Sequence, residues 1–495
     1  MYKKKRIAII GAGPGGLAAA MLLAHRGFEV RIFEKEIQPG GRTAEMKLGS
    51  YRFDIGPTFF MMKYVLDRIF RETGRKLDDH LEFIRLNPAY RLYFNDKYID
   101  VFDDPTEMKE EIERVFPGES GGYDKFLKKE KKRFENLIPL LERSNNNISD
   151  VFSRRFLKAL PYFGLGKSLY DVMGDYFDNP KTRLSFTFQS KYLGMSPWEC
   201  PGAFGLVPYV EHALGVYHVK GGLSELSRKM AQVVQQEGGE IIYNSPVDKL
   251  ILDGKRVKGV KLTNGEKYLA DYTIINADFG YAVSNLFPEG VLKKYSSQKL
   301  KKKDFSCSIF IMYLGLNKQY RLHHNTIIFA DKYKKNVEDV FGGKLSGDDI
   351  SLYVRDHSLT DPSLAPLGKT ALYVLVPVPN NRADIDWQDS QADLRRWTLN
   401  ALKRRLGMED IEDHIEVEKI ITPDGWQNDF NVHLGAVFNL AHHLNQMMWL
   451  RPHNEFEEVK NCYLVGGGTH PGSGLPTIYQ SGQIAADLIS RKEED

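Results

Sequence analysis

Cysteines are scarce in this chain and stand far apart. Only three occur in 495 residues, at Cys200, Cys307 and Cys462, and none forms a CxxC pair. Zinc sites and dithiol redox centres need cysteines at short, repeated spacings, so neither is expected and no metal site is predicted. Scattered free thiols are typical of a protein that works in a reducing cytoplasm.

A strong excess of either charge is also missing. The chain has 68 Lys and Arg against 65 Asp and Glu, a net charge of +3. Nucleic-acid-binding proteins usually show a marked basic excess or patch, so nucleic acid is not an expected partner. The length suggests two or three domains at roughly 100–200 residues each.

Long hydrophobic runs are absent as well. The longest apolar runs, near 309–314 and 371–378, fall far short of the ~20 residues that span a bilayer, so no transmembrane helix is predicted. Basic residues at 3–6 precede an apolar stretch, as in a secretory signal. Glycines around Pro14 interrupt this stretch, which favours a strand, a turn and a helix instead.

Glycine is abundant at the N-terminus, where the pattern predicts a βαβ unit. Residues 5–10 are expected to form a strand, 11–16 a tight turn, 17–25 a helix and 29–34 a second strand. The turn matches GxGxxG, whose glycines allow the bend, the approach of a pyrophosphate and close helix packing. The helix N-terminus favours an anion. Glu34 can accept hydrogen bonds from an adenosine ribose and disfavours NADP, so we predict a dinucleotide site.

Three further features favour FAD over NAD. Gly40-Gly41-Arg42 brings backbone close to a ligand and offers a forked donor for phosphate. The segment 53–58 is extended and ends in a turn that could pass a flavin. The glycine-rich loop 466–477 lies between a strand and a helix, so its backbone N–H groups could face the ring. Within it, His470 is interpreted either as a general base or as a structural residue.

The order of the predicted elements indicates an α/β fold with a discontinuous Rossmann-like FAD-binding domain with a β-meander and an α+β substrate domain. A glycine turn and an amphipathic helix follow residue 218, and 240–276 is predicted to form a β-meander with a hairpin at Asn264-Gly265. The FAD-binding domain is assigned to 1–84, 218–299 and 456–495. The substrate domain, with its membrane-associated part, is assigned to 85–217 and 300–455.

Several motifs together resemble the bacterial-type carotenoid (phytoene/diapophytoene) desaturases of the flavin amine oxidase-like superfamily. They are EK…GGR, DIGPT, SLAPLGKT, RPHN and the terminal GGGTHPGSGLP, and the resemblance spans essentially the whole chain. The family implies FAD as the cofactor. The positions that it implies as FAD-binding are Gly11, Gly13, Pro14, Gly15, Gly16, Glu34, Lys35, Gly41, Arg42, Gly56, Pro57, Thr58, Val247, Gly467, Gly468, Leu475 and Pro476.

The stretches SCSIFIMYLGL and NVEDVFGGKLS are most similar to the thirty-carbon branch of the family. This branch implies desaturation of an apolar polyene, 4,4'-diapophytoene, to diaponeurosporene or diapolycopene in carotenoid biosynthesis. FAD then takes a hydride while a proton leaves the neighbouring carbon. The alternatives are a forty-carbon phytoene desaturase, an amine or porphyrinogen oxidase, and a non-catalytic prenyl-lipid-binding escort. No catalytic base is identified, although Asp150 is a candidate.

An apolar substrate of this kind resides in the bilayer. Residues 151–170 mix aromatic and aliphatic side chains with Arg154, Arg155, Lys158 and Lys167, which suits an interfacial helix. The same pattern also fits a helix packed on the core. Residues 299–303, rich in lysine, are a second candidate contact. We therefore expect a cytoplasmic protein, peripherally associated with the inner face of the cell membrane, and the oligomeric state stays open.

Overall fold

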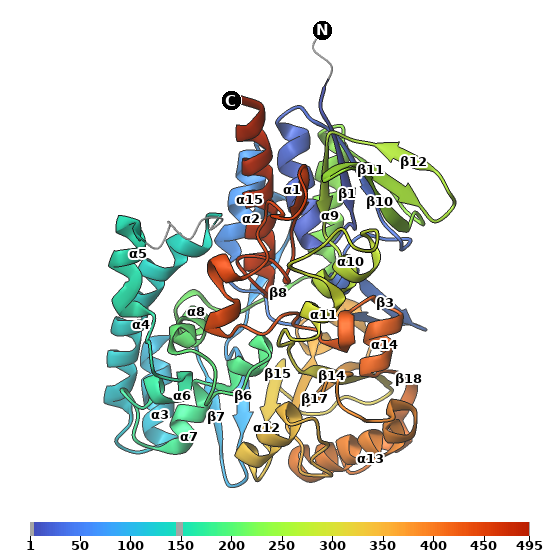
Figure 1. Ribbon diagram of the computed structural model, residues 1–495. Coiled ribbons are helices and arrows are strands. Elements are labelled where there is room, and N and C mark those ends of the chain that lie inside the picture. The colour runs from blue at the N-terminus through green and yellow to red at the C-terminus, as the bar shows by residue number, and fades with distance from the viewer. Residues whose placement is uncertain (1–3, 145–151, 495) are drawn as a thin grey trace.

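The computed structural model describes residues 4–144 and 152–494. Figure 1 shows a Rossmann-like half at the top, a large sheet below it and a helical lobe at the left. The top half contains both termini of the chain.

A five-stranded parallel sheet forms the centre of the upper half. Its strand order is β19-β13-β1-β2-β9, so it combines N-terminal, middle and C-terminal parts of the chain. The strands are β1 (Arg6–Ile10), β2 (Glu29–Phe33), β9 (Glu240–Ile242), β13 (Tyr272–Ile275) and β19 (Cys462–Leu464). Ile and Val recur in them because both faces of the sheet are buried, one by helices and the other largely by the residues of 247–262.

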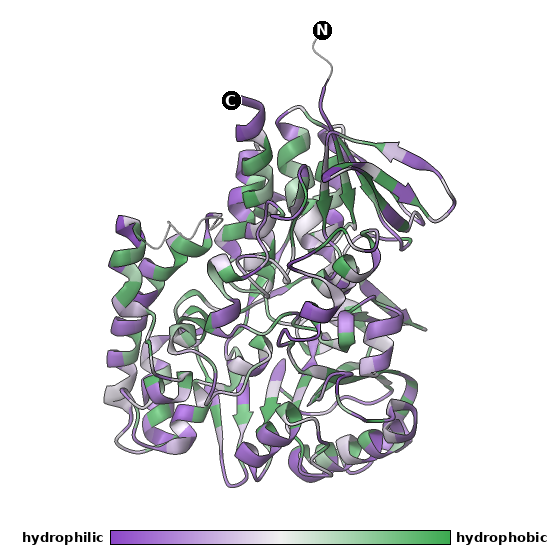
Figure 2. Cartoon of the chain, viewed as in Figure 1, coloured by the Kyte–Doolittle hydropathy of each residue, from purple (hydrophilic) through white to green (hydrophobic). Residues whose placement is uncertain are grey.

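Helix α1 (Pro14–His25) is buried almost throughout, between α9 (Ser224–Gln236) and α15 (Leu475–Glu494). Figure 2 shows apolar residues along α1 and the adjoining part of α15, whereas the exposed end of α15 is hydrophilic. The helix begins at Pro14, not at residue 17 as predicted. Proline suits the first position of a helix because no N–H is needed there, so two loop glycines lie in the first turn.

The predicted meander over 240–276 is confirmed only in its middle. Strands β10 (Val247–Asp253), β11 (Arg256–Leu262) and β12 (Lys267–Leu269) form a three-stranded antiparallel sheet. The outer strands β9 and β13 join the parallel sheet instead, where β13 pairs with β1. All four residues of β13 are buried, which suits the interior of that sheet.

A seven-stranded sheet of order β18-β14-β17-β16-β15-β6-β7 forms the lower half. Its strands are β6 (Tyr90–Tyr93), β7 (Tyr98–Val101), β14 (Ser308–Leu316), β15 (Asn325–Ile328), β16 (Leu352–Asp356), β17 (Thr370–Val378) and β18 (Ile415–Ile421). Alternate residues of β14 face opposite sides. Phe310 and Met312 pack in one core with α13 (Trp387–Leu406), whereas Ile311 and Tyr313 face the aromatic core below the upper half.

The helical lobe contains α3 (Pro105–Val115), α4 (Ser120–Leu141) and α8 (Leu206–Leu214). The single interfacial helix predicted for 151–170 is wrong in its length. Helix α5 covers only Arg154–Ala159, a 3-10 turn follows, and α6 starts at Leu169. Pro161 and two glycines with positive φ, Gly164 and Gly166, interrupt the helix. Asp150 lies outside the described residues.

Two short strands connect the lobe to the rest of the chain. Strands β5 (Phe83–Arg85) and β8 (Tyr217–Val219) pair antiparallel, so the predicted boundaries at 84 and 217 fall in one small sheet. The four domain boundaries themselves stay predictions. Within the described residues, no helix combines the length and apolarity needed to cross a bilayer.

Candidate cofactor site and substrate cavity

The N-terminal glycine loop packs so tightly that side chains are excluded. A Cβ on Gly16 would lie 2.5 Å from the carbonyl oxygen of Gly11, and Gly11 has a φ of +94°. A Cβ on Gly15 would lie 3.2 Å from the backbone nitrogen of Gly466. The structure therefore brings the first and the last glycine loops of the chain together.

The start of α1 is suited to an anion. Among the described residues, no side chain caps α1 and no acid lies in its first turn. The first N–H groups of a helix lack intrahelical acceptors and carry the positive end of its dipole. A pyrophosphate fits this position beside Gly13, Pro14 and Gly15.

Asn276, which the sequence analysis missed, holds the glycine loop in place. It follows β13, and its Nδ2 donates a hydrogen bond to the Gly11 carbonyl oxygen at 3.0 Å. A Cβ on Gly13 would lie 2.9 Å from the same nitrogen. A single asparagine after a buried strand gives no distinctive sequence signal, so only the fold identifies it.

Glu34 lies directly beside the loop, at the end of β2. Its side chain accepts hydrogen bonds from the backbone N–H groups of Ala12 at 2.6 Å and Glu36 at 3.0 Å. Burial raises the pKa of its carboxyl, against the effect of these two donors. The carboxylate can accept hydrogen bonds from ribose hydroxyls. The N–H of Ser245 donates to the Glu34 carbonyl oxygen, which brings the nearby Val247 to this end of β2. Lys35 points elsewhere, to the carbonyl oxygen of Asp429.

The Gly40-Gly41-Arg42 turn adjoins the glycine loop. The Gly40 N–H donates to the Ala12 carbonyl oxygen at 2.9 Å, and Gly41 has a φ of +53°. Arg42 was predicted to contact a phosphate. Its Nη1 donates to the carbonyl oxygen of Val437 at 2.5 Å, and burial lowers the pKa of its guanidinium although Asp278 opposes this. Contact of Arg42 with a phosphate stays a prediction.

The DIGPT segment is held from behind by tyrosines of the large sheet. The hydroxyl of Tyr313 donates to the Ile55 carbonyl oxygen at 2.5 Å, and that of Tyr373 donates to the Gly56 carbonyl oxygen at 3.3 Å. A Cβ on Gly56 would lie 2.9 Å from the Arg42 carbonyl oxygen, so Gly56 and Pro57 run beside the GGR turn. Two of the predicted cofactor segments are therefore neighbours.

A buried Arg355 anchors the same segment through its charge. Its Nη1 donates to Asp54 at 2.9 Å, its Nη2 lies 3.2 Å from His218 Nδ1, and its Nε lies 3.3 Å from His324 Nε2. Burial and the guanidinium lower the pKa of His218 to about 4, so this ring is neutral. Sequence reasoning missed Arg355 because its partners are far away in the chain.

The C-terminal loop is organised by Arg451, which is fully buried. Its guanidinium donates to four carbonyl oxygens, those of Leu440, Gln446, Gly467 and Thr469. A Cβ on Gly468 would lie 2.3 Å from the Cβ of Phe279, so a side chain is excluded there, whereas a Cβ on Gly467 would come closest to the Ser473 hydroxyl, at 3.0 Å. The loop ends at Leu475 and Pro476, the first residues of α15.

His470 lies on the buried side of this loop. Its backbone carbonyl accepts a hydrogen bond from Asn454 at 2.8 Å, and its N–H donates to Pro452. Burial lowers the pKa of the imidazole to about 4. These contacts favour the structural interpretation of His470 over the role of a base.

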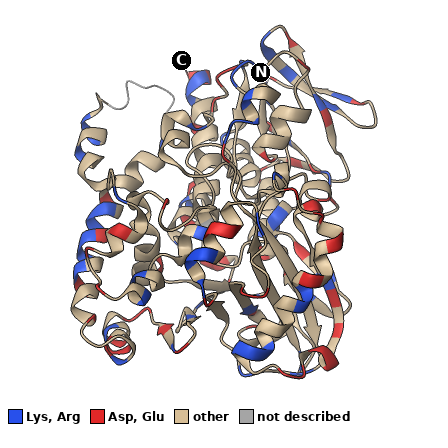
Figure 3. Cartoon of the chain, turned by 60° about the horizontal axis from the view of Figure 1, so that its bottom comes forward, with Lys and Arg blue, Asp and Glu red and all other residues tan. Residues whose placement is uncertain are grey.

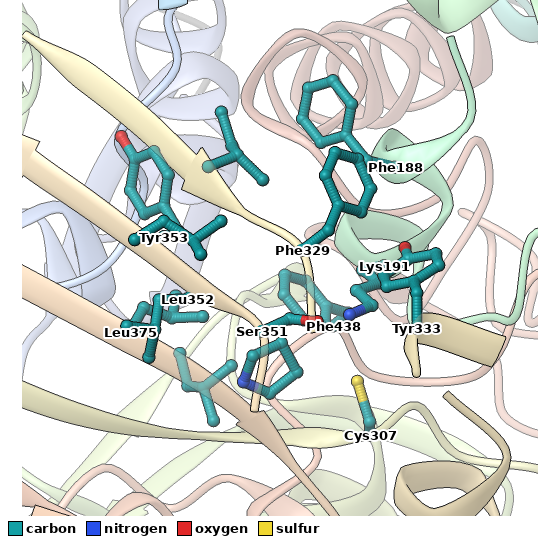
Figure 4. Close-up of a pocket in the computed structure, with 14 residues that line it drawn as sticks. Phe188, Lys191, Cys307, Phe329, Tyr333, Ser351, Leu352, Tyr353, Leu375 and Phe438 are labelled. Atoms are coloured by element: carbon teal, nitrogen blue, oxygen red, sulfur yellow. The ribbon is translucent and has the colours of Figure 1, made fainter. Parts of the chain in front are cut away.

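An apolar cavity of about 40 Å³ lies against the large sheet, between strands β14–β17 and the residues Phe188, Lys191, Tyr333 and Phe438. Figure 4 shows its lining, which is aromatic and aliphatic apart from Lys191, Cys307, Ser351 and the tyrosine hydroxyls. Hydrogen bonds connect the residues around this cavity to three of the cofactor segments. Phe438 lines it and accepts a hydrogen bond from Ser473 at 2.5 Å, the adjacent Val437 binds Arg42, and Tyr353 hydrogen-bonds Thr58.

Comparisons with known proteins agree with this arrangement. The family described as flavin containing amine oxidoreductase matches residues 14–490. The chain belongs to this family. It is therefore an oxidoreductase with the flavin amine oxidase-like fold, and the glycine loops, Glu34 and the start of α1 fit a flavin nucleotide. The predicted fold class and enzyme class are confirmed.

Individual relatives narrow the family further. A 4,4'-diapophytoene desaturase (4,4'-diapolycopene-forming) from Methylomonas sp is 50% identical over 492 residues, covering 99% of this chain and 96% of the relative. A zeta-carotene-forming phytoene desaturase from Myxococcus xanthus is 36% identical, and the match covers 98% of this chain and 94% of the relative. The chain is thus a member of the carotenoid desaturases, as the motifs indicated. An oxidoreductase structure from Methanosarcina mazei, with a TM-score of 0.64, 16% identity and coverage of 98% and 100%, shares the fold.

Proposed function

We propose that this protein is an FAD-dependent desaturase that converts 4,4'-diapophytoene to diaponeurosporene and diapolycopene. The observation that carries the proposal is the 50% identity, over nearly the full length of both chains, to a 4,4'-diapophytoene desaturase that forms 4,4'-diapolycopene. A phytoene desaturase matches at 36% and other 4,4'-diapophytoene desaturases at 34%, so the assignment follows the much higher identity to the Methylomonas enzyme. The apolar lining of the cavity is compatible with a substrate without polar groups, although a thirty-carbon chain would need more space than its volume of about 40 Å³.

The shape of the cofactor site supports FAD among the flavins. The glycine loop and Glu34 form a site for an adenosine diphosphate, which FMN lacks. The DIGPT segment and the C-terminal loop hydrogen-bond the cavity-lining residues Tyr353 and Phe438, which supports a place for the ring next to the cavity. Bound FAD would supply the oxidant that accepts a hydride from the polyene. The protein would hold the apolar chain against the ring and exclude water.

Co-expression with carotenoid synthases tests the substrate. In a host that makes 4,4'-diapophytoene we expect coloured thirty-carbon polyenes, and in a host that makes phytoene little or no colour. Pigment in the phytoene host alone would contradict the substrate assignment. Purified protein should show flavin absorption and release FAD, whereas an escort protein without cofactor would be colourless.

We also propose peripheral attachment to the inner face of the cell membrane through an interfacial patch around α5. The patch consists of Phe152, Leu157, Leu160 and Leu165 with Arg154, Arg155 and Lys158. Phe152 is 79% exposed, Leu157 56% and Leu165 60%, which is unusual for side chains of this size. Figure 3 shows further Lys and Arg along the neighbouring α4, at the left edge.

Half-buried aromatic residues hold the patch on the protein. The ring of Phe156 packs against Phe163 at 5.4 Å and against Trp449 at 5.6 Å between centroids. The exposed apolar side chains can therefore enter a bilayer while the basic residues meet anionic headgroups. Membrane contact of residues 299–303 stays a prediction, although Lys299, Lys301 and Lys302 are exposed.

A further inference from the structure

Among the described residues that line the cavity, Lys191 is the one basic side chain. The function proposed above gives its amine no role. The nitrogen Nζ is buried and has no hydrogen-bond partner among the residues that the structure describes. It lies 4.5 Å from the centroid of the Tyr333 ring. Figure 4 shows the side chain extending into the cavity, toward the space that Phe438 and Cys307 also border.

The surroundings of Lys191 disfavour its charged form. Burial lowers the pKa of the amine to about 7, and among the described groups only Cys307 acts against this. The thiol of Cys307 is itself neutral, because burial raises its pKa to about 12. Tyr333 and Tyr353 on the other walls have raised pKa values and are neutral too, so among the described residues that line the cavity no anion compensates the ammonium.

The amine shares its cavity with two residues that hydrogen-bond the cofactor loops. Phe438 and Tyr353 line the same cavity as Lys191. Phe438 is bonded to Ser473 of the C-terminal loop, and Tyr353 to Thr58 of the DIGPT segment. A polyene that reached the flavin through this cavity would pass the Lys191 amine.

We propose that Lys191 is the proton acceptor of the desaturation, which rests on the proposed function of the site. Bound FAD would accept one hydrogen of the saturated pair with both of its electrons, as a hydride. The neighbouring carbon loses a proton to the neutral amine, and the electron pair left behind forms the new C=C bond. The resulting ammonium then releases its proton to solvent.

Only a weak base is needed in this position. Loss of the hydride leaves positive charge on carbon, and this charge makes the neighbouring C–H bond acidic. A neutral amine can take that proton, whereas an ammonium would repel the developing charge. The other titratable groups of the cavity, Cys307, Tyr333 and Tyr353, are already protonated and cannot serve.

Anaerobic reduction of the flavin by 4,4'-diapophytoene in a single turnover tests the assignment. In the unaltered holoenzyme the rate should rise with pH through about 7, as the amine loses its proton. Lys191→Met, of similar length, should keep its flavin but react roughly 100-fold more slowly or worse and without this pH dependence. Lys191→Arg should be equally slow, because its guanidinium stays protonated.

A matched control is Lys334→Met, since Lys334 is exposed and lies over the Trp198 ring outside the cavity lining. It should keep both the rate and the pH profile. If Lys191→Met reduces its flavin at the unaltered rate, the assignment is wrong while the proposed function stands. If the unaltered protein shows no reduction with either thirty- or forty-carbon substrate, the proposed function falls and the assignment with it.

A second measurement does not depend on activity. In holoenzyme with ¹³C-labelled lysine, the Cε signal that is missing from Lys191→Met identifies Lys191. Its titration near pH 7 is the expected result. Titration at the ordinary lysine value of 10.5 would mean that the amine is charged at neutral pH, and would overturn the proposal.

Discussion

Arg355 Nη1 lies 2.9 Å from Asp54 Oδ2, and this ion pair joins the large sheet to the DIGPT segment. Both side chains are almost completely buried, with 1% and 3% of their surface exposed. Removing two charges from water is unfavourable unless further hydrogen bonds compensate it. Here the N–H of Ser224 also donates to Asp54, and His218 and His324 adjoin Arg355, so the pair fixes one geometry.

We expect Arg355→Met to destabilise the protein by roughly 3–5 kcal/mol, because Asp54 would remain buried without its partner. The position of the DIGPT segment should suffer too, so the purified variant should carry less flavin. Thermal unfolding with and without added FAD measures both effects. Lys335→Met is the control. The lysine of the Lys335–Asp339 ion pair is exposed to solvent, so its loss should lower the free energy of unfolding by less than about 1 kcal/mol.

Gly16→Ala tests whether the close packing of the glycine loop on α1 is needed for cofactor binding. The new methyl group would meet the Gly11 carbonyl oxygen at 2.5 Å, so the loop or α1 has to shift. Overpacking of this kind costs about 1–3 kcal/mol, which we expect to appear mainly as lost flavin affinity. Flavin absorbance per protein, titrated with FAD, gives the answer.

Gly121→Ala is the matched control for this substitution. Gly121 lies in α4, and a Cβ there would have no heavy atom within 4 Å. Flavin content should be unchanged and stability equal or slightly higher, because alanine favours helix. Equal flavin affinity in Gly16→Ala and Gly121→Ala would show that the close packing at Gly16 is not needed for flavin binding.

The sequence predicted those parts of the fold that have local signals. The spacing of Gly11, Gly13 and Gly16 and the hairpin signal at Asn264-Gly265 identify a βαβ unit and a meander, because both depend on nearby residues. Whether β13 belongs to the meander or to the parallel sheet depends on its pairing with β1, which lies more than two hundred residues away. Hydrophobicity alone does not contain this information.

The same distinction applies to the site. Glu34 and Gly41 are predictable from motif spacing, whereas Asn276, Arg355, Arg451 and Lys191 depend on contacts between distant segments. A lone lysine between Ser190 and Tyr192 has the pattern of an exposed residue. Only the packing of α12 (Tyr333–Phe341) and β14 around it shows that its amine is buried.

Glu211 should make stability depend on pH. Its carboxylate accepts hydrogen bonds from Tyr90 at 2.7 Å and Gln189 at 2.6 Å, and burial raises its pKa from 4.5 to about 7. The folded state therefore holds a proton that the unfolded state loses, and stability falls as pH rises from about 4.5 to about 7.

Glu211→Gln should remove this dependence, since an amide stays neutral and can still accept both hydrogen bonds. The variant should match the unaltered protein in melting temperature at pH 4.5 and exceed it at pH 8. Glu110→Gln, an exposed position in α3, should show no such crossover. A constant difference between Glu211→Gln and the unaltered protein at every pH would contradict the protonation assigned to Glu211.

Attachment to membranes should depend on the charge and the exposed apolar side chains of the interfacial patch. Each basic residue near an anionic surface contributes about 1 kcal/mol, so replacing Arg154 and Arg155 by Gln should weaken binding to anionic vesicles by roughly 30-fold. Replacing Phe152 and Leu157 by Ser should weaken binding to anionic and neutral vesicles alike, because it removes inserted apolar area.

Leu367→Ser is the control, since Leu367 is fully exposed but lies outside the patch. Sedimentation with vesicles of each composition separates the two contributions. Equal loss of binding in Leu367→Ser, or no binding of the unaltered protein to anionic vesicles, would remove α5 as the attachment surface.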